Sequence, residues 1–82
     1  MSGATVTVRF FAQLRAAAGA DAVTVSIDAG SDVRDLAARL EARYQGLSLR
    51  GVMCAVDEAY ADPGTELCGG ETVAFLPPVS GG

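Results

Sequence analysis

The chain has 82 residues, of which half are hydrophobic and only 6% aromatic, so it can form one small domain with a modest, mostly aliphatic core. Six arginines stand against ten acidic residues, which gives a net charge of −4 at pH 7. This balance argues against a nucleic-acid-binding protein and against electrostatic attachment to an anionic membrane. No apolar run approaches the ~18 residues that span a bilayer, and the first residues do not resemble a secretory signal. We therefore expect a cytoplasmic protein.

The side chains that most often perform catalysis are scarce. The sequence contains no histidine and no lysine, which removes the commonest general base and the amine nucleophiles. Its two cysteines, Cys54 and Cys68, are too few for a four-cysteine zinc site. Cys54 is expected in the core and Cys68 in an exposed turn, where a sulfur-relay role for its thiol stays an alternative. We therefore predict that the chain is not an enzyme on its own and binds no metal or cofactor.

The first half of the chain shows two alternating segments and one helical stripe. Residues 4–11 and 23–27 alternate, which predicts two strands that form an antiparallel hairpin around about one turn of helix over 12–18. An apolar stripe with helical spacing predicts an amphipathic helix over 32–44, followed by Gly46 as its C-cap.

The start of the helix over 32–44 carries a capping signal. Ser31 or Asp32 can accept a hydrogen bond from a backbone N–H of the first turn. Asp35, three residues after Asp32, would complete a capping box with aspartate in place of glutamate.

The second half of the sequence predicts three strands: a buried strand over 52–56, a short edge strand over 59–61 and a last strand over 71–76. Two prolines, which cannot donate ladder hydrogen bonds, end the last strand. This order of elements, a hairpin followed by a helix and then by further strands, indicates an α+β fold in which one helix lies across one face of the sheet. The expected core consists of Val6, Val8, Phe10, Val25, Leu36, Leu40, Val56, Val73 and Phe75.

The single domain, residues 1–82, ends in a tail over 77–82. The tail reads Pro77, Pro78, Val79, Ser80, Gly81 and Gly82. Extended, six residues reach roughly 20 Å, and glycines can enter a channel too narrow for other residues. A terminal carboxylate is ionised at neutral pH and needs activation, for instance as an acyl-adenylate made by another protein. The alternative is a merely frayed chain end.

Three segments carry a resemblance to a known family over essentially the whole chain. They are residues 8–15, residues 32–36 and, most specific, residues 73–82. The chain is similar to the MoaD/ThiS family of ubiquitin-like sulfur carriers, and most similar to its MoaD-type members, the small subunits of molybdopterin synthase. Asp57, where asparagine is usual, and the turn over 69–71 depart from the family pattern.

The resemblance implies a β-grasp fold, with a mixed sheet, the first and last strands parallel and adjacent, one main helix on one face and a flexible Gly81–Gly82 tail. It also implies that a MoeB-like adenylyltransferase uses ATP and Mg²⁺ to adenylate the Gly82 carboxylate. A sulfur-transfer protein then makes the thiocarboxylate. The tail enters a MoaE-like large subunit and donates sulfur to cyclic pyranopterin monophosphate, in molybdenum cofactor biosynthesis.

A partner interface is predicted on the sheet face opposite the core. By alternation, Phe11 and Leu76 lie on this face, and Tyr60 can extend the patch. The interface is expected to continue into the tail residues Pro77, Pro78, Val79 and Ser80. Scattered surface hydrophobes are the alternative. The arginines at 9, 15 and 50 can pair with a partner or remain solvated charges of little energetic value.

Other functions stay open. The same carrier chemistry can serve thiazole formation for thiamine, as in ThiS, or cysteine biosynthesis. A ubiquitin-like modifier that is conjugated to lysines is a second possibility. A non-catalytic β-grasp interaction domain is a third, and in that case the Gly-Gly end would have no purpose.

Overall fold

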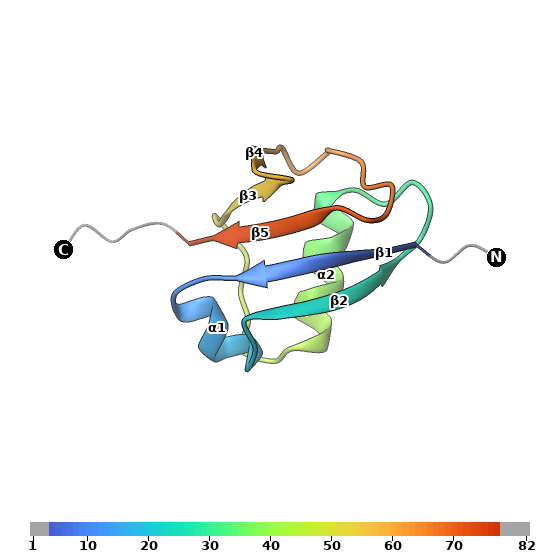
Figure 1. Ribbon diagram of the computed structural model, residues 1–82. Coiled ribbons are helices and arrows are strands. Elements are labelled where there is room, and N and C mark those ends of the chain that lie inside the picture. Colours follow the sequence, from blue (N-terminus) through green and yellow to red (C-terminus); the bar gives the residue numbers. More distant parts are fainter. Residues whose placement is uncertain (1–3, 78–82) are drawn as a thin grey trace.

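The computed structural model describes residues 4–77, which form one mixed sheet and two helices (Figure 1). The elements in chain order are β1 (Ala4–Phe10), α1 (Gln13–Ala18), β2 (Ala22–Ile27), α2 (Val33–Arg43), β3 (Met53–Val56), β4 (Ala59–Tyr60) and β5 (Thr72–Leu76). Every predicted element is present, and its ends differ from the prediction by at most one residue.

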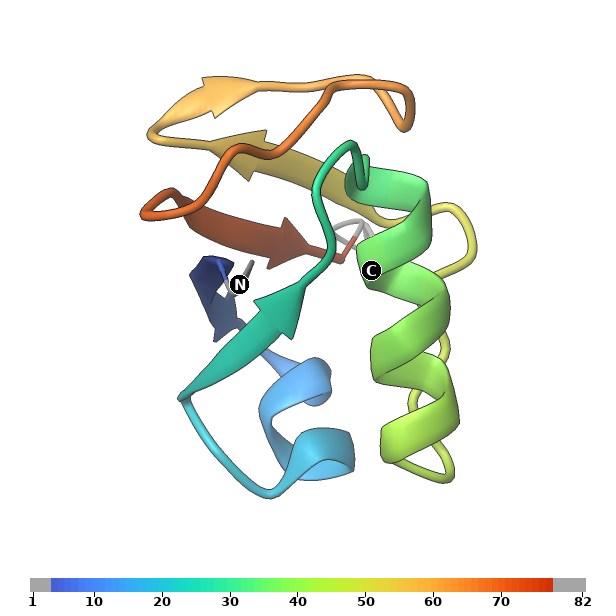
Figure 2. The ribbon, with the colours of Figure 1, turned by 90° about the vertical axis from the view of Figure 1, so that its right-hand side faces the viewer.

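The strand order across the sheet is β2-β1-β5-β3-β4. β1 pairs antiparallel with β2 and parallel with β5, and β3 pairs antiparallel with both β5 and β4. Helix α2 lies across one face of the sheet, whereas no helix of the described chain covers the other face (Figure 2). This is the β-grasp arrangement, with the first and last strands side by side.

β1 and β5 lie side by side in the middle of the sheet, and their alternating patterns place the apolar side chains of both strands on the same face. In the parallel register Val8 lies beside Val73, and Phe10 lies beside Phe75. These side chains point to the α2 face and are at most 2% exposed. Burying them together removes a continuous apolar strip from water, and each such side chain contributes on the order of 1.5–3 kcal/mol.

Eight of the nine expected core residues are buried, and Val56 is half-buried against the same cluster. The core also includes buried side chains from loops that were not expected. These are Leu47, Leu49 and Leu67. Irregular segments have no periodicity, so a sequence pattern cannot distinguish their buried side chains from exposed ones.

The N-terminus of α2 has the predicted capping box. The Asp32 side chain accepts from the Asp35 N–H at 2.9 Å, and the Asp35 side chain accepts from the Asp32 N–H at 3.1 Å. Two backbone donors that the helix leaves unpaired are therefore satisfied.

The predicted cap at the other end of α2 is wrong. The C-cap is Tyr44, in an extended conformation, and its N–H donates to the Leu40 carbonyl at 2.9 Å. The Tyr44 ring packs edge-on against Phe10, with 6.2 Å between ring centroids, which favours leaving the helix at this residue. Gly46, with φ 89°, serves the next turn, in which the Leu47 N–H donates to the Tyr44 carbonyl.

The turn before β5 depends on a carboxylate and on a glycine. Glu71 accepts from the N–H groups of Cys68 at 2.8 Å and Gly69 at 2.6 Å, and these bonds lower its pKa below the ordinary value of 4.5. Gly69 has φ 117°, and a Cβ there would approach the Ala4 Cβ to 2.9 Å. This position therefore requires glycine.

A two-residue turn joins β3 to β4. Asp57 and Glu58 have φ 50° and 73°, the conformation that favours asparagine followed by glycine. Asp57 bonds twice to Thr72: its N–H donates to the Thr72 carbonyl at 2.8 Å, and its carboxylate accepts from the Thr72 N–H at 2.9 Å. Asp57 therefore accepts the hydrogen bond that an asparagine would accept at this position. Its two bonds to Thr72 hold the turn against the start of β5.

Among residues 4–77, no helix is long and apolar enough to cross a membrane.

We expect Asp32→Ala to lower the free energy of unfolding by about 1 kcal/mol, because it removes the acceptor that caps α2. Urea denaturation followed by circular dichroism measures the loss. Asp28→Ala is the control: within residues 4–77 the Asp28 side chain makes only an exposed ion pair with Arg39 at 3.3 Å, worth a few tenths of a kcal/mol to about 1 kcal/mol. Equal losses in the two variants would contradict the capping role.

Glu71 makes stability depend on pH. Because its folded pKa lies below the ordinary value, its contribution is fully present above pH 4.5 and is lost as pH falls through the folded pKa. The difference in unfolding free energy between wild type and Glu71→Gln should therefore be largest near neutral pH and shrink below pH 4.5. Urea titrations across this range test it. Glu66→Gln, at an exposed side chain, is the control; a pH-independent difference for Glu71→Gln would refute the assignment.

Candidate functional site

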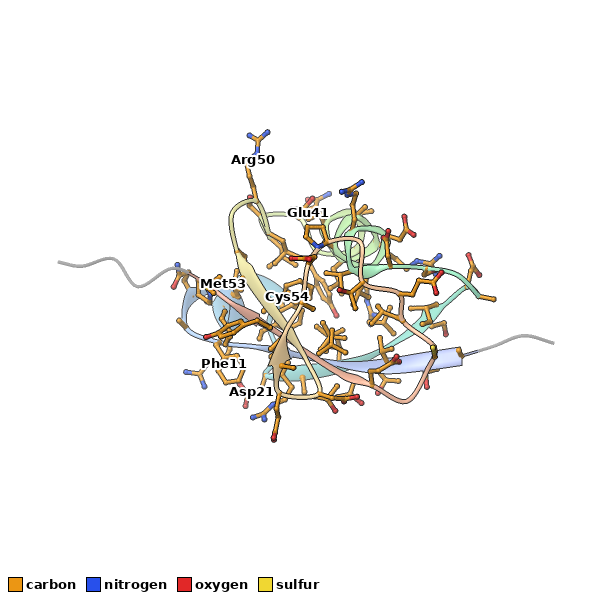
Figure 3. The ribbon with its side chains drawn as sticks, turned by 90° about the horizontal axis from the view of Figure 1, so that it is seen from above. Phe11, Asp21, Glu41, Arg50, Met53 and Cys54 are labelled. Atoms are coloured by element: carbon orange, nitrogen blue, oxygen red, sulfur yellow. The ribbon has the colours of Figure 1, made fainter. Side chains whose placement is uncertain are left out.

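The candidate site begins where β5 ends. Leu76 and Pro77 are half-buried, and the residues expected to carry the chemistry, Gly81 and Gly82, lie outside the described residues together with Pro78, Val79 and Ser80. Pro77 lines a hollow of about 460 Å³ with residues of α1 and of the loop before β3, Leu14 and Arg50 among them. Arg50 points outward from this loop, away from Phe11 (Figure 3).

Strand register arranges the side chains of the uncovered sheet face in rows. Ala74 of β5 pairs with Arg9 of β1 on one side and with Ala55 of β3 on the other. Leu76 pairs with Met53 in the row nearer the tail, and Thr72 pairs with Thr7 in the row farther from it. Since side chains two apart along a strand share a face, these residues form one continuous surface.

A shallow groove of about 560 Å³ crosses this surface. Its lining residues come from β1, β3, β5 and the turn after β3: Thr7, Arg9, Phe11, Ala55, Asp57, Glu58, Thr72, Ala74 and Leu76. We call it the outer groove. It has an apolar middle, one cation at its β1 side and two carboxylates at the β3–β4 turn.

Phe11 is held at the end of β1 by a local turn. Its carbonyl accepts from the Leu14 N–H at 3.1 Å, across Ala12, which has φ 55°. The Arg9 guanidinium stands 5.2 Å from the centroid of the Phe11 ring, within the range of a cation–π contact. This stacking keeps an aromatic ring and a positive charge together at one end of the outer groove.

The structure brings two of the predicted interface residues together and sets a third apart. Phe11 and Leu76 line the outer groove, as alternation indicated. Tyr60 is 73% exposed and pairs with Ala55 at the sheet edge, but it lines a different hollow, with Met53, Pro63 and residues of α2. Binding of a partner to these residues stays a prediction.

Sequence reasoning missed the floor of the outer groove and one of its walls. Ala55 and Ala74 are small, so they gave no hydrophobic signal, although alternation already placed Ala74 on the face of Leu76. Glu58 looked like an ordinary turn residue. Its place in the groove depends on the positive φ of the turn, which the sequence does not display.

The cysteines lie where they were predicted. Cys54 is 7% exposed, and burial raises the pKa of its thiol, which keeps it protonated and a poor nucleophile. Cys68 is exposed in the turn before β5. Within residues 4–77, no three histidine, cysteine, aspartate or glutamate side chains are grouped to hold a metal ion.

Several solved structures are similar to this chain. The chain is similar to the small archaeal modifier protein 1 of Haloferax volcanii, with 25% identity, a TM-score of 0.86, and coverage of 94% of this chain and 100% of that one. It is similar to a putative molybdopterin converting factor, subunit 1, from Pyrococcus furiosus, with 30% identity, a TM-score of 0.80, and coverage of 93% and 99%.

A third similar structure is a complex of subunits 1 and 2 of molybdopterin-converting factor from Helicobacter pylori, matched at 26% identity and a TM-score of 0.69, with coverage of 95% of this chain and 99% of that one. The sequence model of the ThiS family matches residues 8–82 and so includes the Gly-Gly end. This chain therefore belongs to the MoaD/ThiS family of ubiquitin-like sulfur carriers.

Proposed function

We propose that this chain is the sulfur-donating small subunit of a molybdopterin synthase, acting in the cytoplasm. The observation that carries the proposal is the family match through residue 82, combined with the position of β5 at the centre of the sheet. In this proposal, the strand that ends in the middle of the sheet leads directly into the tail on which other proteins act. The 30% identity to a putative subunit 1 of a molybdopterin converting factor supports this acceptor over others.

The proposed chemistry takes place on the Gly82 carboxylate. An adenylyltransferase of the MoeB type transfers AMP from Mg²⁺-bound ATP to this carboxylate and releases pyrophosphate. Sulfide-level sulfur, delivered by a sulfur-transfer protein, then attacks the acyl-adenylate and displaces AMP, which leaves a thiocarboxylate. In the large subunit, of the MoaE type, the sulfur attacks cyclic pyranopterin monophosphate and links it to Gly82 as a thioester. Water then cleaves the acyl C–S bond, which leaves the sulfur on the pterin and returns the small subunit to its carboxylate form.

The residues of this chain fit a carrier rather than a catalyst. The chain has no lysine, so an activated Gly82 cannot be captured by a lysine of another copy. It has no histidine, so acid–base groups for sulfur transfer must come mainly from its partners. In this proposal, the outer groove with Phe11 and Leu76, next to the end of β5, is the surface to which a partner binds.

A second candidate function is a ubiquitin-like protein modifier, in which Gly82 is joined to lysines of other proteins. The similarity to a small archaeal modifier protein supports it. Transfer of sulfur to a thiazole or cysteine precursor is a further alternative that uses the same activated tail.

The first experiment is intact-mass analysis after incubation with the adenylyltransferase, ATP, Mg²⁺ and a sulfur source. We expect one oxygen to be replaced by sulfur, and the shift to disappear as molybdopterin forms once the large subunit and pyranopterin are added. The variant that lacks Gly82 should show no shift. A shift that persists with the pyranopterin would point to another acceptor, isopeptide products would favour the modifier, and no shift at all would reject the carrier function.

We expect Phe11→Asp to weaken binding to the large subunit by about tenfold or more, because it places a charge in the apolar middle of the interface. Isothermal titration calorimetry measures the affinity, and urea denaturation checks that the variant is folded. Phe11→Leu is the control that keeps an apolar side chain and should retain most of the affinity. Wild-type affinity in the aspartate variant would remove Phe11 from the interface.

A further inference from the structure

Strand β2 has one unpaired edge. It lies at the end of the strand order and pairs within residues 4–77 only with β1 (Figure 1). In line with the register of that pair, the Phe10 N–H donates to the Asp21 carbonyl at 2.9 Å. In an antiparallel pair, residues that bond to the neighbouring strand alternate with residues that bond away from it. The N–H and C=O groups of Ala22, Thr24 and Ser26 therefore point away from β1.

Little within residues 4–77 occupies this edge. The N–H and C=O groups of Thr24 have no backbone partner there. The Ser26 carbonyl accepts from the Arg39 guanidinium at 3.1 Å, and the same guanidinium reaches the Asp28 carboxylate at 3.3 Å. A carbonyl oxygen has two lone pairs, so this one can accept a second hydrogen bond. The opposite edge of the sheet is much shorter, because β4 has only two residues.

The side chains along this edge match a second copy of the same strand. Residues 22–26 read Ala-Val-Thr-Val-Ser, which is nearly the same pattern in both directions. Two such strands, antiparallel about Thr24, bring Thr24 beside Thr24 and Val23 beside Val25, and such pairs stabilise a ladder. Val23 is only half-buried in one copy, so the pairing would cover it. β2 also contains no charged residue and no proline, which are the devices that keep edge strands apart.

The charges at the two ends of β2 are complementary in this arrangement. Asp21, before the strand, pairs with Arg15 at 3.6 Å, and Asp28, after it, pairs with Arg39 at 3.3 Å; all four side chains are exposed. Antiparallel pairing brings the end of one β2 against the start of the other. Arg39 of one copy then lies beside Asp21 of the other, so opposite charges meet at both ends of the contact.

We propose that the β2 edge binds a second copy of this chain, with the two β2 strands antiparallel about a twofold axis at Thr24. The two sheets then form one continuous sheet, in which each Thr24 N–H donates to the Thr24 carbonyl of the other copy. β1 separates β2 from β5, so the contact does not involve the strand that leads into the tail. The net charge of −4 on each copy opposes association, and the dimer is therefore weak.

Thr24→Pro tests the hydrogen bonds of the edge. Proline removes the N–H that points outward but leaves the bonds to β1 in place, and edge strands tolerate it there. Sedimentation equilibrium of the wild-type chain should show a monomer–dimer equilibrium. The dissociation constant should rise about tenfold or more in the variant, because two hydrogen bonds are lost. Thr24→Val, which keeps the N–H, is the matched control and should dimerise as wild type does; urea unfolding checks that both variants are folded.

A charge exchange tests the orientation of the two strands. A dimer of the Asp21→Arg variant, or of the Arg39→Glu variant, would place like charges together at both ends, so each alone should self-associate about fivefold more weakly or worse. A mixture of the two variants restores opposite charges at both ends and should form a heterodimer with nearly wild-type affinity. Arg34→Glu makes the same reversal on α2, but beside residues of β3 and β4, and should associate as wild type does.

Amide hydrogen exchange locates the contact. The Thr24 N–H should exchange more slowly as the chain concentration rises, whereas the N–H of Tyr60, on the outer edge of β4, should not change. Slowing at Tyr60 in place of Thr24 would overturn the inference. So would a wild-type chain that stays monomeric at every concentration, a dimer that survives Thr24→Pro, or a mixture of charge variants that fails to associate. None of these outcomes depends on sulfur chemistry at Gly82.

Discussion

The parallel pairing of β1 with β5 is the constraint on which the rest of this structure depends. It joins the two ends of the described chain at the centre of the sheet, where Val8 and Val73 are fully buried under α2. A parallel pair cannot be closed by a tight turn, so the intervening chain must cross one sheet face, and α2 does so. Within residues 4–77 no helix covers the other face (Figure 2), and there Phe11 and Leu76 line one groove next to the end of β5.

Much of this fold could be predicted from local patterns. Alternation identified β1 and β5, and helical spacing with the Asp32 capping box identified α2, because each signal is repeated or reciprocal within a few residues. The parallel order of β1 and β5 was expected only from the family resemblance, since alternation does not reveal which strands are neighbours. Gly46 was misplaced as a cap because a tertiary contact, Tyr44 on Phe10, decides where the helix ends.

The candidate site was predictable where side chains are large and not where they are small. Phe11 and Leu76 stood out as apolar residues on the polar side of an alternating pattern. Ala55 and Ala74, the floor of the outer groove, come together only through the register of β3 with β5, and Glu58 reaches the groove only through the turn geometry. A hollow forms between the side chains of neighbouring strands, whereas a sequence pattern describes only one strand at a time.

In the proposed function, the chemistry takes place on a glycine carboxylate. Glycine has no side chain, so the reactive end itself cannot distinguish one partner protein from another. Discrimination must then come from the sheet, and the same surface has to serve an adenylating protein and a sulfur-accepting protein in turn. The outer groove, with its apolar middle and opposite charges at its two sides, suits this requirement. Hydrophobic contact with the apolar middle of the groove contributes to the affinity for both partners. The charges at the groove rim are exposed, so they orient each partner as it binds and add little to the lifetime of the complex. In the proposed function, successive partners therefore compete for this surface, and binding of one excludes the other until the tail is released.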